Sequence, residues 1–199
     1  MRSGGFLRKE DSYNMRIIER AIIFATKAHE GAVRKGKGRP FILHPIEVMS
    51  IAASLTDDEE VLAAAVLHDT VEDTPVTREE IELEFGSRVA DLVAAESEDK
   101  RRERPAESTW LIRKQETIDQ LKVANRDTKL ISLGDKLSNL RDMDRDYAEI
   151  GEELWNRFHQ KDRNMHCWYY TSIYDILLAE FGDNRVLREY KAHLESLFS

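Results

Sequence analysis

The sequence contains few residues that break helices or form covalent cross-links. Cys167 is the only cysteine among 199 residues, which excludes an intrachain disulfide and predicts a reducing, cytoplasmic location. The 9 glycines and 4 prolines are too few for a disordered or linker-rich chain. No apolar run approaches the roughly 20 residues that a membrane-spanning helix needs. Residues 1–14 lack the apolar segment of a signal peptide, and we expect them to form a flexible lead-in.

An excess of positive charge is also missing. The formal net charge of −8 argues against a duplex nucleic-acid partner, because such proteins usually carry a basic stripe. A small anionic ligand stays compatible with this charge, since a local basic loop can lie on an acidic protein. With 41% hydrophobic and 34% charged residues, the chain can bury a core beneath a well-solvated surface. Its length suits one domain, or one domain with a small appendage.

Helical spacing dominates what is present. Apolar residues recur at helical intervals from Met15 to Glu30, and a leucine stripe follows Asp127 as far as about Asp144. Start signals precede several of the other predicted helices, namely Asp57 or Asp58, Thr77 with Glu80, and Ser108 or Thr109. Helical segments are also expected from about Asp162 and from about Asn184. A further helical segment is expected from about Tyr147. Because strand-like alternation is absent, the sequence predicts an all-α fold.

One predicted helix leads from a buried segment directly into charged residues. The run VLAAAVL, residues 61–67, is apolar on all sides, as in a buried helix. His68, Asp69, Glu72 and Asp73 follow, and on a continuous helix they span about 140° of its surface, so they can line one pocket. The alternative is a surface His–Asp pair followed by a solvated helix end.

Two further segments add similar groups. His44 lies between apolar residues in FILHPIEV, just before a proline that suits the first turn of a helix. Asp135 and Asn139 share a helix face in LISLGDKLSNLRDM, and Gly134 permits close backbone approach. Taken singly, the histidine reads as a core residue and the aspartate as a helix cap or ion-pair partner. Together, two histidines and two aspartates suit a catalytic divalent metal with open positions.

The motifs LHPIEV, AAVLHDTVEDT and GDKLSNLRDM resemble the HD-domain phosphohydrolases, and more narrowly the hydrolase domain of the RelA/SpoT alarmone family and its small stand-alone members. The resemblance runs from about Ala21 to Arg141. It implies an all-α, phosphodiesterase-like helical fold, with a hydrolase core over residues 15–146. Residues 147–199 are then a C-terminal helical extension packed on that core.

The resemblance also implies roles for individual residues. His44, His68, Asp69 and Asp135 match the family's ligands for one divalent ion, typically Mn²⁺. Glu72 and Asp73 match the pair linked to activation of the attacking water, and which of the two accepts the proton stays open. Physical chemistry agrees, because a metal lowers the pKa of bound water and a nearby carboxylate can accept the proton.

The expected partner is a small phosphorylated nucleotide. Arg34 and Lys35 match the family's pair flanking the base, and Asn139 matches a residue that contacts the sugar–phosphate region. Without the resemblance, the loop GAVRKGKGRP reads equally well as a solvated basic loop, and Lys37 and Arg39 stay open in either case. The sequence also leaves open whether the chain forms a homo-oligomer.

Three positions depart from the family pattern. Gly134 stands where many members have alanine, and Lys136 stands where the long bifunctional enzymes often have arginine. The segment ESEDK replaces a V-T-K-type signature that lies near the substrate in the family. This last departure leaves the substrate less defined than the metal site. Nothing resembles a synthetase domain, so any alarmone activity should be degradation only.

Three hypotheses follow. The first is a manganese-dependent hydrolase that converts guanosine tetra- or pentaphosphate to GDP or GTP and pyrophosphate. The second keeps the chemistry but changes the substrate to another nucleotide with a 2′- or 3′-phosphate, such as NADPH. The third is a non-catalytic nucleotide- or metal-binding regulator. The complete set of candidate ligands argues against this third hypothesis, because a degenerate site would be expected to lose some of them.

Overall fold

The computed structural model describes residues 15–34, 38–101 and 103–199. Within these ranges the chain forms α-helices, one 3₁₀-helix and no strand; Val33 and Pro40 form an isolated bridge. The all-α fold predicted from the sequence is confirmed. The helices are α1 (Ile17–Ala28), α2 (Leu43–Ala52), α3 (Glu59–Leu67), α4 (Thr70–Asp73), α5 (Arg78–Phe85), α6 (Ser87–Glu96), α7 (Ala106–Val123), α8 (Arg126–Ile150), the 3₁₀-helix η2 (Gly151–Arg157), α9 (Arg163–Phe181) and α10 (Arg185–Phe198).

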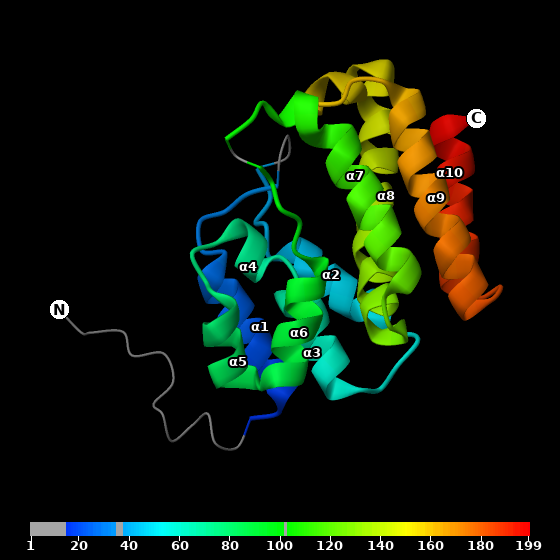
Figure 1. Ribbon diagram of the computed structural model, residues 1–199. Helices are drawn as coiled ribbons and strands as arrows, with labels where there is room; N and C mark the ends of the chain where they lie inside the picture. The colour runs from blue at the N-terminus through cyan, green and yellow to red at the C-terminus, as the bar shows by residue number, and fades with distance from the viewer. Residues whose placement is uncertain (1–14, 35–37, 102) are drawn as a thin grey trace.

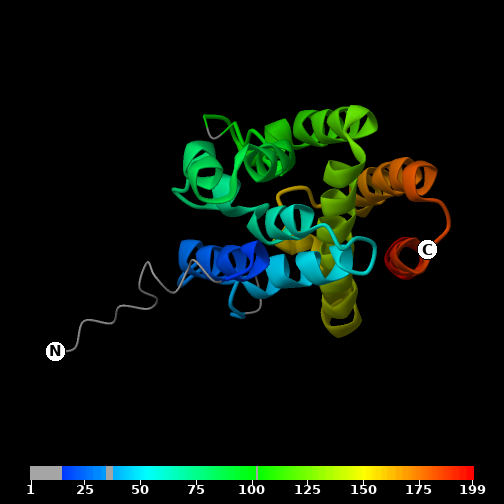
Figure 2. The ribbon, with the colours of Figure 1, turned by 90° about the horizontal axis from the view of Figure 1, so that it is seen from below.

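The long helix α8 joins two groups of helices. Figure 1 shows α1 to α6 gathered on one side of it and α9 and α10 on the other, and Figure 2 shows the same division from below. One hydrophobic core contains residues of α1, α2, α3, α5 and α6 together with Leu130 and Ile131 of α8. A second core contains residues of α7, η2, α9 and α10 together with Leu133, Leu137 and Leu140 of α8. None of the described helices is both long and apolar enough to cross a membrane.

Several helix starts agree with the signals in the sequence. Asp58 caps α3 by accepting hydrogen bonds from the backbone N–H groups of Glu60 and Val61. Thr77 and Glu80 form the predicted capping box at α5, and Asp162 and Asn184 cap α9 and α10. α7 begins two residues before the predicted Ser108. The helix expected from Tyr147 is instead the last turn of α8, followed by η2.

The predicted division between core and extension falls inside α8, because this helix continues past residue 146 to Ile150. The division therefore stays a prediction, as does the lead-in over residues 1–14, which lies outside the described residues. What the contacts do show is that α9 and α10 pack on α8 and on each other. The helix that carries Asp135 is thereby held from both sides.

Gly134 lies where α8 passes close to α2. A Cβ atom at this position would stand 2.9 Å from the Val48 carbonyl oxygen and 3.0 Å from the Val48 Cγ1. Because real Cβ contacts are essentially never that short with a backbone atom, the absence of a side chain is what allows the close approach. The approach anticipated from the sequence is therefore present, and it brings His44 of α2 toward Asp135 of α8.

We expect Gly134→Ala to lower the free energy of unfolding by about 1–3 kcal/mol, the usual cost of overpacking a core. The added methyl group must push α2 and α8 apart, which outweighs the gain of about 1 kcal/mol in helix propensity. Urea unfolding followed by circular dichroism measures the difference. A variant as stable as the parent would show that the two helices separate at no cost.

Candidate metal centre and adjoining cavity

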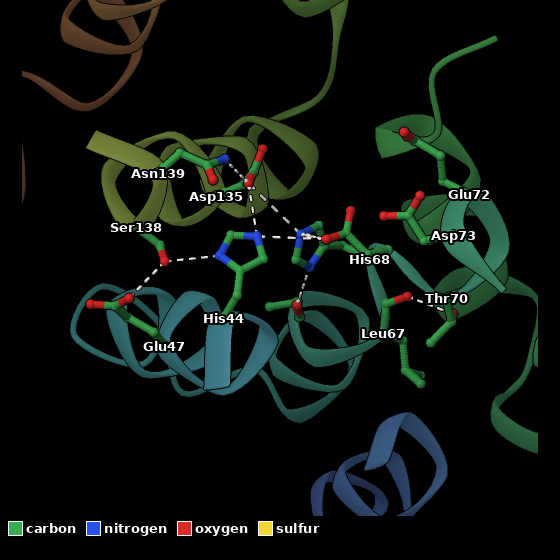
Figure 3. Close-up of polar contacts among 12 residues, drawn as sticks. His44, Glu47, Leu67, His68, Thr70, Glu72, Asp73, Asp135, Ser138 and Asn139 are labelled. Atoms are coloured by element: carbon green, nitrogen blue, oxygen red, sulfur yellow. Dashed lines mark hydrogen bonds and ion pairs between the residues drawn. The ribbon is translucent and has the colours of Figure 1, made fainter. Parts of the chain in front are cut away.

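The imidazoles of His44 and His68 meet the carboxylate of Asp135 at the junction of α2, α3 and α8 (Figure 3). One candidate ligand atom from each of the three lies within 4.8 Å of the others, and all three residues are buried. Asp69 contacts both rings, since its Oδ2 lies 3.5 Å from His44 Nε2 and 3.2 Å from His68 Nε2. Asp135 Oδ1 lies 3.2 Å from His44 Nε2 and 3.9 Å from His68 Nε2. The four predicted ligands thus come together from three separate segments of the chain.

The helix predicted to run through this motif is interrupted. α3 ends at Leu67, and the single turn α4 begins at Thr70. Side chains explain the break, because His68 Nδ1 bonds the Ala65 carbonyl at 2.8 Å and the Thr70 hydroxyl donates to the Leu67 carbonyl at 2.6 Å. These carbonyls are the ones that a continuing helix would use, and local side-chain bonds compete with it. The expectation of one continuous helix is therefore wrong.

The hydrogen bonds of the two imidazoles define their tautomers. A carbonyl can only accept, so His68 Nδ1 carries a proton that it donates to Ala65. His44 Nδ1 lies 2.9 Å from the Ser138 hydroxyl oxygen, whose own proton is donated to Glu47. Both rings are thus Nδ1–H, and both Nε2 atoms face the carboxylates of Asp69 and Asp135. This is the arrangement of imidazoles that ligate a metal through Nε2.

Such a cluster needs a cation at its centre, because lone pairs of nitrogen and oxygen otherwise face each other. His68 Nε2 is buried and forms no hydrogen bond among the described residues. Burial alone would lower the pKa of His68, but the charges of Asp69 and Asp135 outweigh it and raise this pKa to about 9. In the metal-free protein a proton on His68 can therefore supply the positive charge at the centre of the cluster. The donor set of two imidazoles and two carboxylates fits a divalent transition metal equally well.

The acidic partners are held in their charged forms. Burial would raise the pKa of Asp135, but the neighbouring Lys136 and the two imidazoles hold it well below its ordinary range. Burial acts likewise on Asp69, whose pKa His68 nonetheless lowers to about 2. Metal ligands must be deprotonated, so both carboxylates are ready to bind a cation at neutral pH.

Glu72 and Asp73 line the same cavity and are held by the segment after α6. The backbone N–H of Glu98 donates to Glu72 Oε2 at 2.9 Å, and the Lys100 ammonium contacts both carboxylates. Burial raises the pKa of Glu72, whereas the Glu98 hydrogen bond and Lys100 act to lower it. A carboxylate with a raised pKa is a better proton acceptor near neutral pH. Lys100 belongs to the ESEDK segment, whose contact with the acidic pair no sequence pattern indicated.

Arg34 and Asn139 meet on another wall of the cavity. The Arg34 guanidinium donates to Asn139 Oδ1 at 2.9 Å and to Asp142 Oδ2 at 2.8 and 3.0 Å, and it lies over the Phe41 ring. The Asn139 amide nitrogen donates to Asp135 Oδ1 at 2.6 Å, which joins this wall to the metal cluster. Lys35 lies outside the described residues, so its predicted role is untested.

The cavity has a volume of about 1000 Å³, large enough for a nucleotide with several phosphates. It extends from the metal cluster, past Lys136 of α8, to α7 and α9, where Lys114 and Tyr169 line it. Glu96 also lines it, and burial raises the pKa of Glu96 to about 7. No cavity role for α7 or α9 could be predicted from the sequence, because Trp110 of α7 and the aromatic residues of α9 look like ordinary core.

The HD domain family model matches residues 21–162 of the chain. The human guanosine-3′,5′-bis(diphosphate) 3′-pyrophosphohydrolase MESH1 is 37% identical over 175 residues, which cover 86% of this chain and 88% of that protein. Its zebrafish (Danio rerio) counterpart is 38% identical over 65% of this chain and 70% of its own length. A GTP pyrophosphokinase of Myxococcus xanthus is 30% identical, but the match covers only 22% of that longer protein.

Two solved structures share the fold. One belongs to a metazoan ortholog of SpoT that is described as hydrolysing ppGpp; it superposes with a TM-score of 0.69 at 28% identity and covers 94% of this chain and 96% of that one. The other is a Listeria monocytogenes protein with a TM-score of 0.65 at 32% identity, covering 78% of this chain and 93% of that one. Because the first structure covers 94% of this chain, the similarity includes the C-terminal helices.

Proposed function

Because the chain belongs to the HD domain family, we propose that it is a metal-dependent 3′-pyrophosphohydrolase of guanosine tetra- and pentaphosphate. One observation carries the proposal. Four candidate metal ligands, an acidic pair and an arginine–asparagine wall all line a single cavity of nucleotide size. The relatives named as ppGpp hydrolases, which match most of this chain, supply the substrate.

His44, His68, Asp69 and Asp135 would hold one divalent ion, which we take to be Mn²⁺. When bound, a divalent ion supplies Lewis-acid activation of a water molecule and of a phosphoryl oxygen. Manganese itself, the cytoplasmic location and the oligomeric state stay predictions from the sequence. The donor set supports a divalent transition-metal ion, because two imidazoles with two carboxylates favour such an ion over calcium.

In the proposed reaction, water attacks the phosphorus attached to the ribose 3′-oxygen. A bond forms from the water oxygen to phosphorus, and the bond from phosphorus to the 3′-oxygen breaks. The pair Glu72 and Asp73 accepts a proton from the water, while the departing 3′-oxygen gains one and becomes a hydroxyl group. GDP or GTP leaves together with pyrophosphate. Lys100 holds the acidic pair in place and is a positioning residue rather than a catalytic one.

Arg34, Lys35 and Asn139 are the proposed nucleotide-binding residues. An arginine side chain fixed by Asp142 and Asn139 presents its planar face without a large loss of conformational freedom on binding. Asn139 connects this wall to the cluster through Asp135. It is therefore well situated to contact the part of the nucleotide between base and scissile phosphate.

We expect Arg34→Ala to raise KM for the nucleotide about tenfold or more while lowering kcat less, because the lost contact is made in the ground state as well. Steady-state kinetics at saturating manganese separates the two effects. Arg188→Ala on α10, a residue whose side chain is 62% exposed, serves as the matched control. A larger fall in kcat than rise in KM would remove Arg34 from ground-state binding.

Product analysis tests the proposed function directly. Manganese-loaded protein is incubated with ppGpp, and separately with NADPH, before and after chelation. Release of GDP and pyrophosphate that stops on chelation supports the proposal. Phosphate release from NADPH alone would assign the site to the second hypothesis. Inertness toward both substrates, with metal still bound, would favour a binding protein.

A further inference from the structure

Two residues lie directly behind His44, on the side of the ring that faces away from the metal cluster (Figure 3). His44 Nδ1 lies 2.9 Å from the hydroxyl oxygen of Ser138, and that hydroxyl donates to Glu47 Oε2 at 2.7 Å. Ser138 is fully buried on α8, while Glu47 is half-buried on α2, one turn after His44. The three groups form a continuous relay from the surface to the cluster.

The direction of the hydrogen bonds follows from the acceptor at the outer end. A carboxylate only accepts, so the Ser138 proton points toward Glu47. The Ser138 oxygen is then left to accept a hydrogen bond from His44 Nδ1–H. This arrangement allows one tautomer of His44, in which the Nε2 lone pair faces Asp135 and Asp69.

His68 achieves the same tautomer by a different means. Its Nδ1 donates to a backbone carbonyl, that of Ala65, which no side-chain substitution removes. His44 depends on side chains instead. Of the two candidate imidazole ligands, His44 is therefore the one whose orientation and basicity the chain can adjust through its outer partners.

We propose that Ser138 and Glu47 are positioning residues that set the affinity of the centre for its metal through His44. The inference rests on the metal site in the proposed function. Neither residue reaches the reacting atoms, and the resemblance implies no role for either, although Glu47 lies in LHPIEV and Ser138 in GDKLSNLRDM. Their effect reaches the metal only through the His44 ring.

The outer end of the relay is itself anchored to the C-terminal helices. Arg141 donates to Glu47 Oε1 at 2.9 Å and to Glu189 of α10 at 2.7 Å. The Glu47 carboxylate is thus shared between Ser138 and Arg141, which fixes its position. Through these contacts α10 supports a metal ligand that it does not touch.

The test measures Mn²⁺ affinity by competition with a fluorescent chelator, for Ser138→Ala, for Glu47→Gln and for the double variant. We expect Ser138→Ala to weaken binding by about 10- to 100-fold, the usual cost of losing an outer-shell partner. Glu47→Gln should weaken it by a smaller factor, about three- to tenfold, because the one amide oxygen cannot accept from both Ser138 and Arg141. Ser50 is an exposed serine on α2, the helix that carries His44 and Glu47. Ser50→Ala is the matched control and should bind Mn²⁺ like the parent.

The double variant distinguishes a relay from unrelated structural damage. If Glu47 acts through Ser138, the double variant binds within about twofold of Ser138→Ala alone. Effects that multiply instead would overturn the proposal, as would parental affinity in a folded Ser138→Ala. Should Ser138→Ala not fold, parental affinity in Glu47→Gln overturns it.

The titration uses no nucleotide, so its outcome is separate from that of the proposed function. Weaker metal binding in the variants, combined with a parent protein inert toward ppGpp, would leave the relay intact and remove the proposed substrate. Hydrolysis of ppGpp by the parent, combined with unchanged metal affinity in the variants, would support the proposed function and overturn the relay.

Discussion

Exchange of His68 for alanine is expected to remove bound metal and to lower kcat by on the order of 10³-fold or more, since Lewis-acid stabilisation contributes several kcal/mol to the barrier. His68 supplies a buried Nε2 that lies among the carboxylates and bonds to nothing else among the described residues. Its loss leaves Asp69 and Asp135 facing each other across a void. Metal content by atomic absorption and turnover of ppGpp should therefore fall together.

Asp69→Asn is the companion variant, because it keeps the shape of the side chain and removes its charge. It should weaken the metal site without opening a cavity. His193→Ala is the control, since His193 pairs with Asp144 on the α10 side of the molecule. Retention of both metal and turnover in His68→Ala and Asp69→Asn would show that the cluster is not the catalytic centre.

Glu72→Gln should separate chemistry from metal binding. We expect kcat to fall by about 10²-fold or more while the metal stays bound, because the amide cannot accept a proton. The amide oxygen can still accept the hydrogen bond from the Glu98 backbone, so the segment after α6 should keep its position. Turnover is measured at saturating manganese, with metal content determined on the same sample.

Asp73→Asn identifies which carboxylate accepts the proton. A larger fall in kcat for Asp73→Asn than for Glu72→Gln would assign that role to Asp73. Parental kcat in both variants would show that the pair takes no part in catalysis. Exposed Glu79 on α5 offers the matched control, as Glu79→Gln. Because burial raises the pKa of Glu72, its basic form is lost as the pH falls through that raised value. The acidic limb of the parent profile should flatten in Glu72→Gln.

The fold could be predicted wherever local rules decide it. Asp58, Thr77, Asp162 and Asn184 begin helices because their side chains satisfy free N–H groups, a requirement visible in sequence. The break between α3 and α4 could not be predicted in the same way. It arises because the side chains of His68 and Thr70 bond carbonyl groups of α3, and both residue types also occur inside continuous helices.

The same distinction applies to the site. The candidate ligands could be predicted because the family motifs assign metal binding to the histidines and aspartates at these positions. The roles of Ser138 and Lys100 could not be predicted, because serine and lysine occur on most helix surfaces and loops. Their roles depend on which segment lies opposite, as with Ser138 and His44, which are 94 residues apart. Contacts of that kind are set by tertiary packing.

The two cores on either side of α8 affect how unfolding can be observed. Trp110 and Trp155 belong to the core formed with α7, η2, α9 and α10, and Trp168, the only other tryptophan in the chain, packs against it. Intrinsic fluorescence therefore reports on that half of the molecule, whereas far-ultraviolet circular dichroism averages over both halves. Agreement of the two melting temperatures would indicate a single cooperative transition. A dichroic transition at a lower temperature than the fluorescence transition would show that the half bearing His44 and His68 unfolds first.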